Sequence, residues 1–158
     1  MLKCPVTARL AALAFLVSAV LTVLTGCSGG SSGGSGVNES VSTAVQNSSS
    51  AIATSRLVLQ QISDGRLTRA ASSTALDDAL KELQTSRDTV AKLAPGTGQD
   101  RDTVAAALEV LDGCAAALST ARNAVASSDG TPAIADGSRE LAAAADRLAQ
   151  LSAKEGGK

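Results

Sequence analysis

The sequence contains no histidine, tryptophan or tyrosine, and its one phenylalanine, Phe15, lies in an apolar stretch near the start. Histidine is the side chain most often used for acid–base catalysis and the commonest metal ligand, so its absence disfavours both kinds of site. Aromatic side chains supply large buried areas and line ligand pockets. Any core beyond residue 27 must therefore be built from Leu, Val, Ile and Ala, which suits closely packed helices better than a β-sandwich.

Charge is nearly balanced over the 158 residues, with 14 Lys+Arg against 15 Asp+Glu. Because Lys3 and Arg9 precede the apolar stretch, the chain beyond Cys27 holds 12 basic residues against all 15 acidic ones, a net charge of -3. A mildly acidic domain without a basic stripe argues against nucleic-acid binding and against a polybasic membrane-binding patch. The length suits one domain of ordinary size.

Residues 1–26 have the layout of an export signal. A basic start is followed by the uncharged stretch Leu10 to Leu24, and the small residues Thr25 and Gly26 precede Cys27. This stretch is shorter than the ~20 residues that a membrane-spanning helix needs. An uncleaved membrane anchor is the alternative, which the length and the lack of a following positive cluster disfavour.

The four residues Leu24, Thr25, Gly26 and Cys27 resemble the lipobox of bacterial lipoproteins. The resemblance implies that the Cys27 thiol receives a diacylglycerol group and that a signal peptidase cleaves between Gly26 and Cys27. It also implies a lipid-anchored protein on the extracytoplasmic face of the cell membrane. Two acyl chains, of the palmitate type, suffice for stable anchoring, so the membrane is the expected partner through this diacylglycerol.

After Cys27, residues 28–36 are all serine or glycine. Such a segment cannot bury apolar surface, so residues 27–36 are predicted to be a lipidated cysteine and a flexible tether with a root-mean-square span of about 16 Å. A phosphate-binding loop would instead need a preceding strand and a following Gly-Lys-Ser/Thr, and neither is present.

From residue 37 to 154 the apolar residues recur every three or four positions, which predicts an Ala-rich helical domain, followed by a tail at 155–158. Four runs of roughly 23 to 30 residues are separated by short breaks. Short breaks place successive helices antiparallel, so the predicted fold is all-α, an up-down-up-down four-helix bundle. A three-helix bundle with a frayed first segment is the alternative, because the first run is rich in Ser, Thr and Asn.

Several residues mark the expected ends of the first two helices. Asp64-Gly65 should end the first, since glycine suits the left-handed position after a helix. The second could begin at Leu67 or at Ser73, and Pro95-Gly96 should stop it. On its surface, Asp77 with Lys81 and Asp88 with Lys92 have the spacing of stabilising ion pairs.

The last helix has an ambiguous start. Thr131 is expected as its N-cap, with Pro132 at the first helical position. Gly113 and Gly137 interrupt the last two helical runs. Either they allow a close helix crossing, or the last helix begins only at Ser138.

Cys114 is the single thiol that remains once Cys4 is removed with the signal and Cys27 is lipidated. Its place among small residues predicts a buried apolar role. An intermolecular disulfide is the first alternative, because the exterior of the cell is oxidising. A nucleophile is disfavoured, because activation of a thiol usually needs a base such as histidine.

The acidic residues Asp77, Asp78 and Glu82 are predicted to form a solvated helix face, not a metal or acid–base cluster. Arg122 lies close to the predicted buried seam, where it should extend outward to solvent or else pair with an acid inside the bundle. The sequence therefore offers no catalytic residue, metal site or cofactor.

Two functions remain. The first is a non-enzymatic lipoprotein with an interaction or structural role in the cell envelope, contacting an unidentified envelope protein. The second is a small-ligand-binding or sensor lipoprotein that uses a pocket between helices. The Ala-, Gly- and Arg-rich, Lys-poor composition resembles that of small lipoproteins from actinobacteria.

Overall fold

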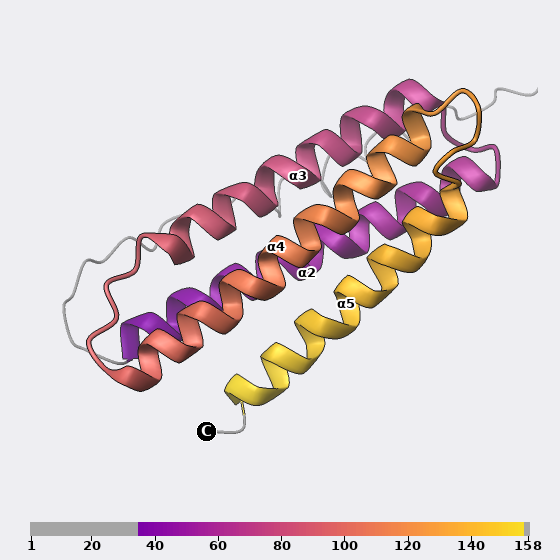
Figure 1. Ribbon diagram of the computed structural model, residues 1–158. Helices are drawn as coiled ribbons and strands as arrows, with labels where there is room; N and C mark the ends of the chain where they lie inside the picture. Colours follow the sequence, from indigo (N-terminus) through magenta and orange to yellow (C-terminus); the bar gives the residue numbers. More distant parts are fainter. Residues whose placement is uncertain (1–34, 157–158) are drawn as a thin grey trace, which may run out of the picture. The chain divides into compact units, whose positions relative to one another are not determined.

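The structure is a computed structural model that describes residues 35–156. This part of the chain forms four helices and no strand, which confirms the all-α class (Figure 1). They are α2 (Ser35–Ser63), α3 (Arg69–Ala91), α4 (Gly98–Ala126) and α5 (Ile134–Gly156). The first helix begins at Ser35, so it includes the last two residues of the predicted 27–36 tether.

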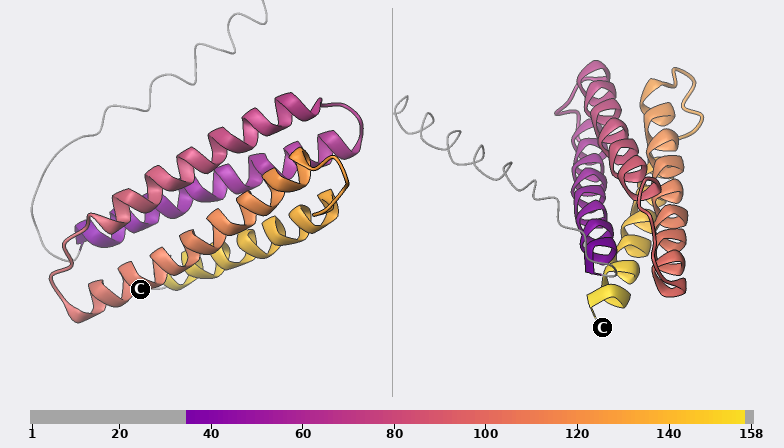
Figure 2. Two further views of the ribbon diagram at one scale, coloured as in Figure 1. Left: turned by 45° about the horizontal axis from the view of Figure 1, so that its top comes forward. Right: turned by 90° about the vertical axis from the view of Figure 1, so that its left-hand side faces the viewer.

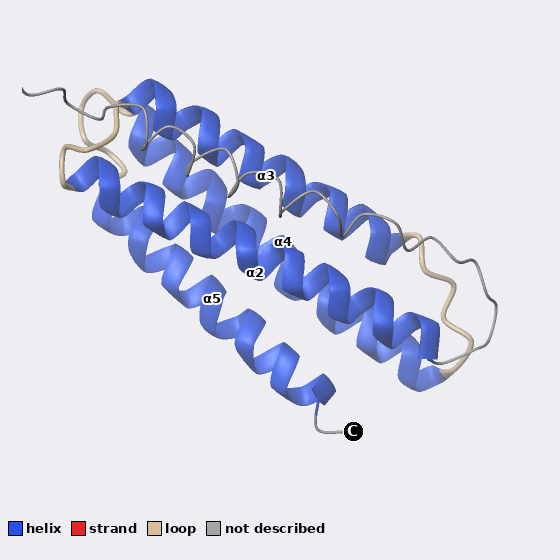
Figure 3. Cartoon of the chain, turned by 180° about the vertical axis from the view of Figure 1, so that it is seen from behind, coloured by secondary structure: helices blue, strands red, loops and turns tan. Residues whose placement is uncertain are grey.

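The four helices pack side by side as a helical bundle (Figure 2). Helices α2 and α4 each contact the other three, whereas α3 and α5 do not contact each other within the described residues. Figure 3 shows α3 and α5 as the outer helices of the view, with α2 and α4 between them. The core is therefore centred on the α2–α4 pair.

The core is aliphatic, as the lack of aromatic residues requires. Alanines such as Ala107, Ala121 and Ala144 are also buried, and their small side chains let neighbouring helices approach closely. The largest fully buried side chains include Ile52, Leu59, Leu76, Leu83, Leu111, Leu118, Leu141 and Leu148.

Helix α2 is an integral part of this core, so the three-helix alternative is wrong. It runs unbroken for 29 residues, and Val41, Ile52 and Leu59 on it are fully buried. Ser48 and Ser55 are buried too, and their hydroxyls donate to the carbonyls four residues earlier at 2.7 and 2.8 Å. These bonds satisfy the hydroxyls internally, so a serine-rich helix can enter the core without unpaired polar groups.

Local capping interactions define where α2 ends and where α3 and α4 begin. Gly65 has φ +69°, as the predicted stop requires. Thr68 then caps α3 by accepting a hydrogen bond from the Ala71 N–H at 3.2 Å, so α3 begins between the two predicted starts. At the start of α4, Thr97 and Asp100 form a reciprocal capping box.

The prediction for the start of the last helix is wrong. Thr131 is not the N-cap of α5, because the helix begins only at Ile134, three residues later. The Thr131 N–H donates to Asp129 at 3.0 Å and to the Ser127 hydroxyl at 2.9 Å. The Thr131–Pro132 peptide bond is cis. The helix begins instead at Ile134, and the preceding Ala133 N–H donates to the Asp136 carboxylate at 3.0 Å. The acceptor at the start of α5 is therefore an acid in the first helical turn.

Gly137 lies inside α5 and allows a close crossing, which decides between the two predicted roles of this glycine. A Cβ at this position would lie 2.8 Å from the Ala121 Cα on α4 and 3.3 Å from the Leu59 Cδ1 on α2. The first helical turn of α5 therefore sits directly against both central helices. Gly113 differs, because a Cβ there would approach only the Arg147 guanidinium, at 3.1 Å.

Candidate functional site

The predicted lipidation site lies outside the described residues. Leu24, Thr25, Gly26 and Cys27 all precede Ser35, and so does Cys4. Anchoring at Cys27 therefore remains a prediction from the sequence.

Cys114 is a free thiol on α4 with no exposed surface, as its surroundings in the sequence predicted. Removal from water raises the pKa of this thiol from 9.0 to about 11, and the nearby Arg147 charge opposes the shift. A protonated, buried thiol is a poor nucleophile. Its burial also leaves no surface through which a second chain could form a disulfide.

The acidic residues on α3 lie on the solvent-facing side, as predicted. Asp77, Asp78 and Glu82 are all exposed, and Asp77 forms an ion pair with Arg122 of α4. Within residues 35–156, no group of three His, Cys, Asp or Glu side chains is placed to hold a metal ion.

Arg122 extends outward to solvent, as one of its two predicted roles required, and it also pairs with an acid, Asp77, at the surface. Its Nε donates to Asp77 Oδ1, and the two side chains are 49% and 47% exposed. The acid that it meets is thus on the rim between α3 and α4, not inside the bundle. The bridge links two helices that are neighbours in sequence.

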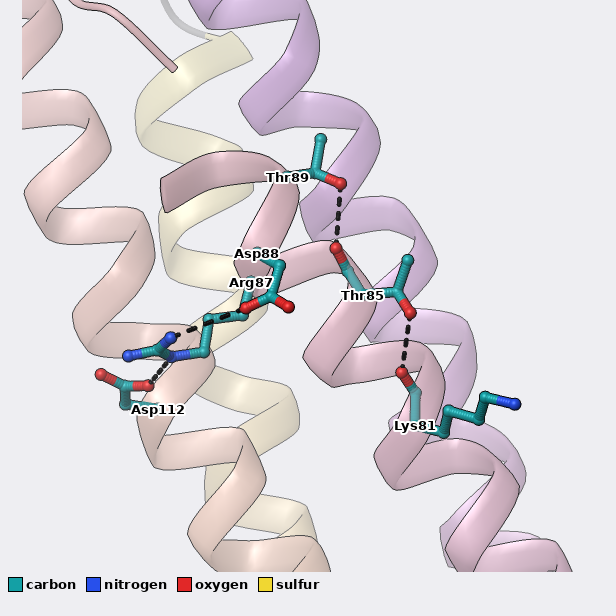
Figure 4. Close-up of polar contacts among 6 residues, drawn as sticks. All are labelled: Lys81, Thr85, Arg87, Asp88, Thr89 and Asp112. Carbon is teal, nitrogen blue, oxygen red and sulfur yellow. Dashed lines mark hydrogen bonds and ion pairs between the residues drawn. The ribbon is translucent and has the colours of Figure 1, made fainter. Parts of the chain in front are cut away.

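A second bridge joins the same two helices. The Arg87 Nε donates to Asp112 Oδ1 at 2.5 Å (Figure 4). This hydrogen bond, together with the Asp112 charge, raises the pKa of the Arg87 guanidinium. Arg87 also lies 3.9 Å from Asp88, its neighbour on α3.

Neither of the two ion pairs predicted along α3 is found among the ion pairs of the described residues. Asp77 meets Arg122 rather than Lys81, and Asp88 lies beside Arg87 rather than Lys92. Arginine reaches across an interhelical groove and offers several donors in a fixed fork, so it competes well for a carboxylate. Spacing along one helix cannot reveal such a partner on the next.

An open groove of about 550 Å³ lies between α2 and the first turns of α5. Leu57, at 55% exposure, is the one large apolar side chain of the described residues that is left mainly in solvent. Arg56 provides the one charge in the groove. The lining residues are Ala53, Arg56, Leu57, Gln60, Ser63 and Ser138.

A second open groove, of about 350 Å³, lies between the first half of α4 and the last turns of α5. It combines apolar and charged side chains, among them two cations. The lining residues are Ala106, Glu109, Val110, Arg147, Gln150, Leu151 and Lys154. No sequence motif marked either groove, because each is assembled from helices that are not defined until they pack.

Comparison of the chain with family models, with curated proteins and with solved structures finds no match. Among the described helices, α4 alone is long and apolar enough to cross a membrane, by length and composition. Because α4 contacts all three other helices, its apolar character is that expected of a core helix.

Proposed function

We propose that the chain is a non-enzymatic bacterial lipoprotein, held on the extracytoplasmic face of the cell membrane by a diacylglycerol on Cys27. The observation that carries the proposal is the position of Leu24-Thr25-Gly26-Cys27 directly behind a basic start and a short apolar stretch. The Ser/Gly segment that follows is suited to a tether between the lipid and the helical bundle.

For the bundle we propose the up-down-up-down, antiparallel order. Arg69 is the first residue of α3, and its guanidinium donates to two carbonyls at the end of α4. These are the carbonyls of Val125, at 3.2 Å, and of Ser127. Gly137, near the start of α5, packs against Ala121, near the end of α4. Contacts between the start of one helix and the end of its neighbour support opposite directions.

The role of the bundle in this proposal is contact with another envelope protein. The described helices fill their core with aliphatic side chains, and the two grooves are open to solvent. Leu57 gives the α2–α5 groove an exposed apolar side chain among polar ones, and this supports a protein contact there. The α4–α5 groove instead favours the second function, binding of a small ligand.

Replacement of the predicted lipidated residue tests the anchor. Cys27→Ala should leave an unlipidated precursor, because no thiol remains at the cleavage site. Cys4→Ala is the matched control and should mature normally. The measurement is metabolic labelling with a fatty-acid analogue, followed by intact mass of the product. Lipid label on the Cys27→Ala chain at the level of the control would disprove the anchor.

Site-specific crosslinking in intact cells tests the contact site. A photoreactive residue in place of Leu57 should give a discrete crosslinked product with one envelope protein. The same residue in place of Thr85, an exposed position on α3, should not. Equal products from both positions, or none from Leu57, would contradict a partner at the α2–α5 groove.

A further inference from the structure

Two cations of α5 lie along the α4–α5 groove. Arg147 and Lys154 are seven residues apart, so they lie on one face of the helix, about 10 Å apart along its axis. Gln150 lies between them and adds amide donors. This arrangement lines one side of the groove with hydrogen-bond donors.

The neighbouring helix makes room for Arg147. Its Nη1 lies 3.1 Å from the place where a side-chain Cβ of Gly113 would stand, so any larger residue there would displace the guanidinium. Arg87 and Arg122 are bound to carboxylates. Arg147, in contrast, has no carboxylate within 4.0 Å among the described side chains. Its donors face an open groove.

The opposite side of the groove carries one acid, Glu109, so the lining keeps a net positive charge. The remaining lining side chains are apolar: Ala106 and Val110 are half-buried, and Leu151 is 7% exposed. The volume of about 350 Å³ falls within the range of ~300–1,000 Å³ typical of small-molecule sites. An apolar floor beside two cations is complementary to an aliphatic chain with an anionic head.

We propose that the α4–α5 groove binds an amphiphilic anion, an aliphatic chain that ends in a phosphate or carboxylate group. The head would lie between Arg147 and Lys154, and the chain would lie on Val110 and Leu151. The α2–α5 groove is a poorer match, because it has one cation and its main apolar residue, Leu57, projects into solvent. The proposal rests on the groove itself and does not depend on lipidation of Cys27.

The test is a titration of the full-length chain, in phosphatidylcholine nanodiscs, with octyl phosphate. Methyl resonances of Val110 and Leu151 should shift and saturate, whereas those of Leu83 on α3, which does not line the groove, should stay in place. Arg147→Gln with Lys154→Gln should weaken binding at least about tenfold, since the head loses both charged donors. Lys81→Gln with Arg101→Gln removes one exposed lysine and one exposed arginine that line neither groove, and should leave the affinity unchanged.

Two further probes separate the parts of the ligand. Octyl glucoside, with the same tail and a neutral head, should bind at least about tenfold more weakly, and so should inorganic phosphate, which lacks the tail. Equal affinity for octyl glucoside would overturn the role of the cations, and equal affinity for inorganic phosphate would overturn that of the apolar floor. Equal loss in the two double variants would also overturn the site. Circular dichroism confirms that each variant retains its helices.

Discussion

At the residue scale, two helical glycines show how surroundings decide the effect of one methyl group. Gly137 faces the backbone of α4, and backbone cannot move aside. Gly113 faces the end of the Arg147 side chain, which is exposed and can turn away. Alanine favours a helix by ~1 kcal/mol relative to glycine. We expect this gain to appear in the stability of the Gly113→Ala protein, whereas overpacking should outweigh it in Gly137→Ala.

Gly137→Ala is therefore expected to destabilise the protein by about 1–3 kcal/mol, through overpacking against Ala121 and Leu59. Gly113→Ala, the matched control, should leave stability unchanged or raise it by up to ~1 kcal/mol. Urea unfolding followed by circular dichroism measures both. A Gly137→Ala protein as stable as the parent would show that α5 does not need this close approach.

Burial of the Cys114 thiol makes the stability of the folded protein depend on pH. The pKa in the folded protein, about 11, lies above the ordinary value of 9.0, so folding favours the protonated form. Between these values the unfolded state holds fewer protons than the folded state, and stability must fall as pH rises. Below pH 9 the thiol is protonated in both the folded and the unfolded state, so its contribution to stability is fully present.

Cys114→Ala should therefore flatten the decline in stability between about pH 9 and 11. The comparison is made in a chain whose Cys4 and Cys27 are replaced by serine, so that no other thiol titrates. The chain has no tyrosine that would titrate in this range. Free energies of unfolding from urea curves across this range give the two slopes, and parallel slopes would refute the buried thiol.

At the element scale, helix ends depend on single side chains. Thr97 accepts from the Asp100 N–H at 3.1 Å while the Asp100 carboxylate accepts from the Thr97 N–H at 3.2 Å. Asp100 is 5% exposed, so its pairing also satisfies a nearly buried carboxylate. Thr85, by contrast, lies within α3 and donates to the Lys81 carbonyl of its own helix (Figure 4).

Thr97→Ala should cost about 1 kcal/mol, because α4 loses its N-cap. Thr85→Ala is the control, and it should be neutral or stabilising by a few tenths of a kcal/mol, because alanine is the better helix former. Thermal unfolding ranks the two proteins against the parent. A larger loss for Thr85→Ala than for Thr97→Ala would contradict the capping box.

The sequence was sufficient to predict what depends on neighbours in the chain. Apolar spacing predicted four helices, and Gly65 was correctly expected at the stop of the first. It failed where the partner is distant in sequence. Arg122, for example, meets Asp77 from another helix. The start of α5 was missed although its partner is local: Asp136, three residues later, accepts a hydrogen bond from the Ala133 N–H.

Sequence patterns also could not predict the two candidate grooves. Periodicity assigns residues to an inner or outer face, but it does not say which outer residues of two helices meet. Arg147 and Val110 become neighbours across a groove only when α4 packs against α5. Leu57 is exposed beside the α2–α5 groove, a position that no pattern in the sequence identified.

At the scale of the whole molecule, stability should be shared by all four helices because α2 and α4 both contact every other helix. Loss of packing on α2 would expose parts of α3, α4 and α5 at once. The bundle should consequently unfold in one cooperative transition, as small single domains usually do.

Two substitutions on α2 test this integration. Ile52→Ala should cost about 2–5 kcal/mol, because Ile52 is fully buried and its removal leaves a cavity in the core. Leu57→Ala, five residues later on the same helix, should change stability by less than about 0.5 kcal/mol, because Leu57 already faces solvent. Urea unfolding measures both values, and hydrogen exchange along α2 shows whether it opens with the rest. A small effect of Ile52→Ala, together with fast exchange throughout α2, would mean that three helices alone hold the fold.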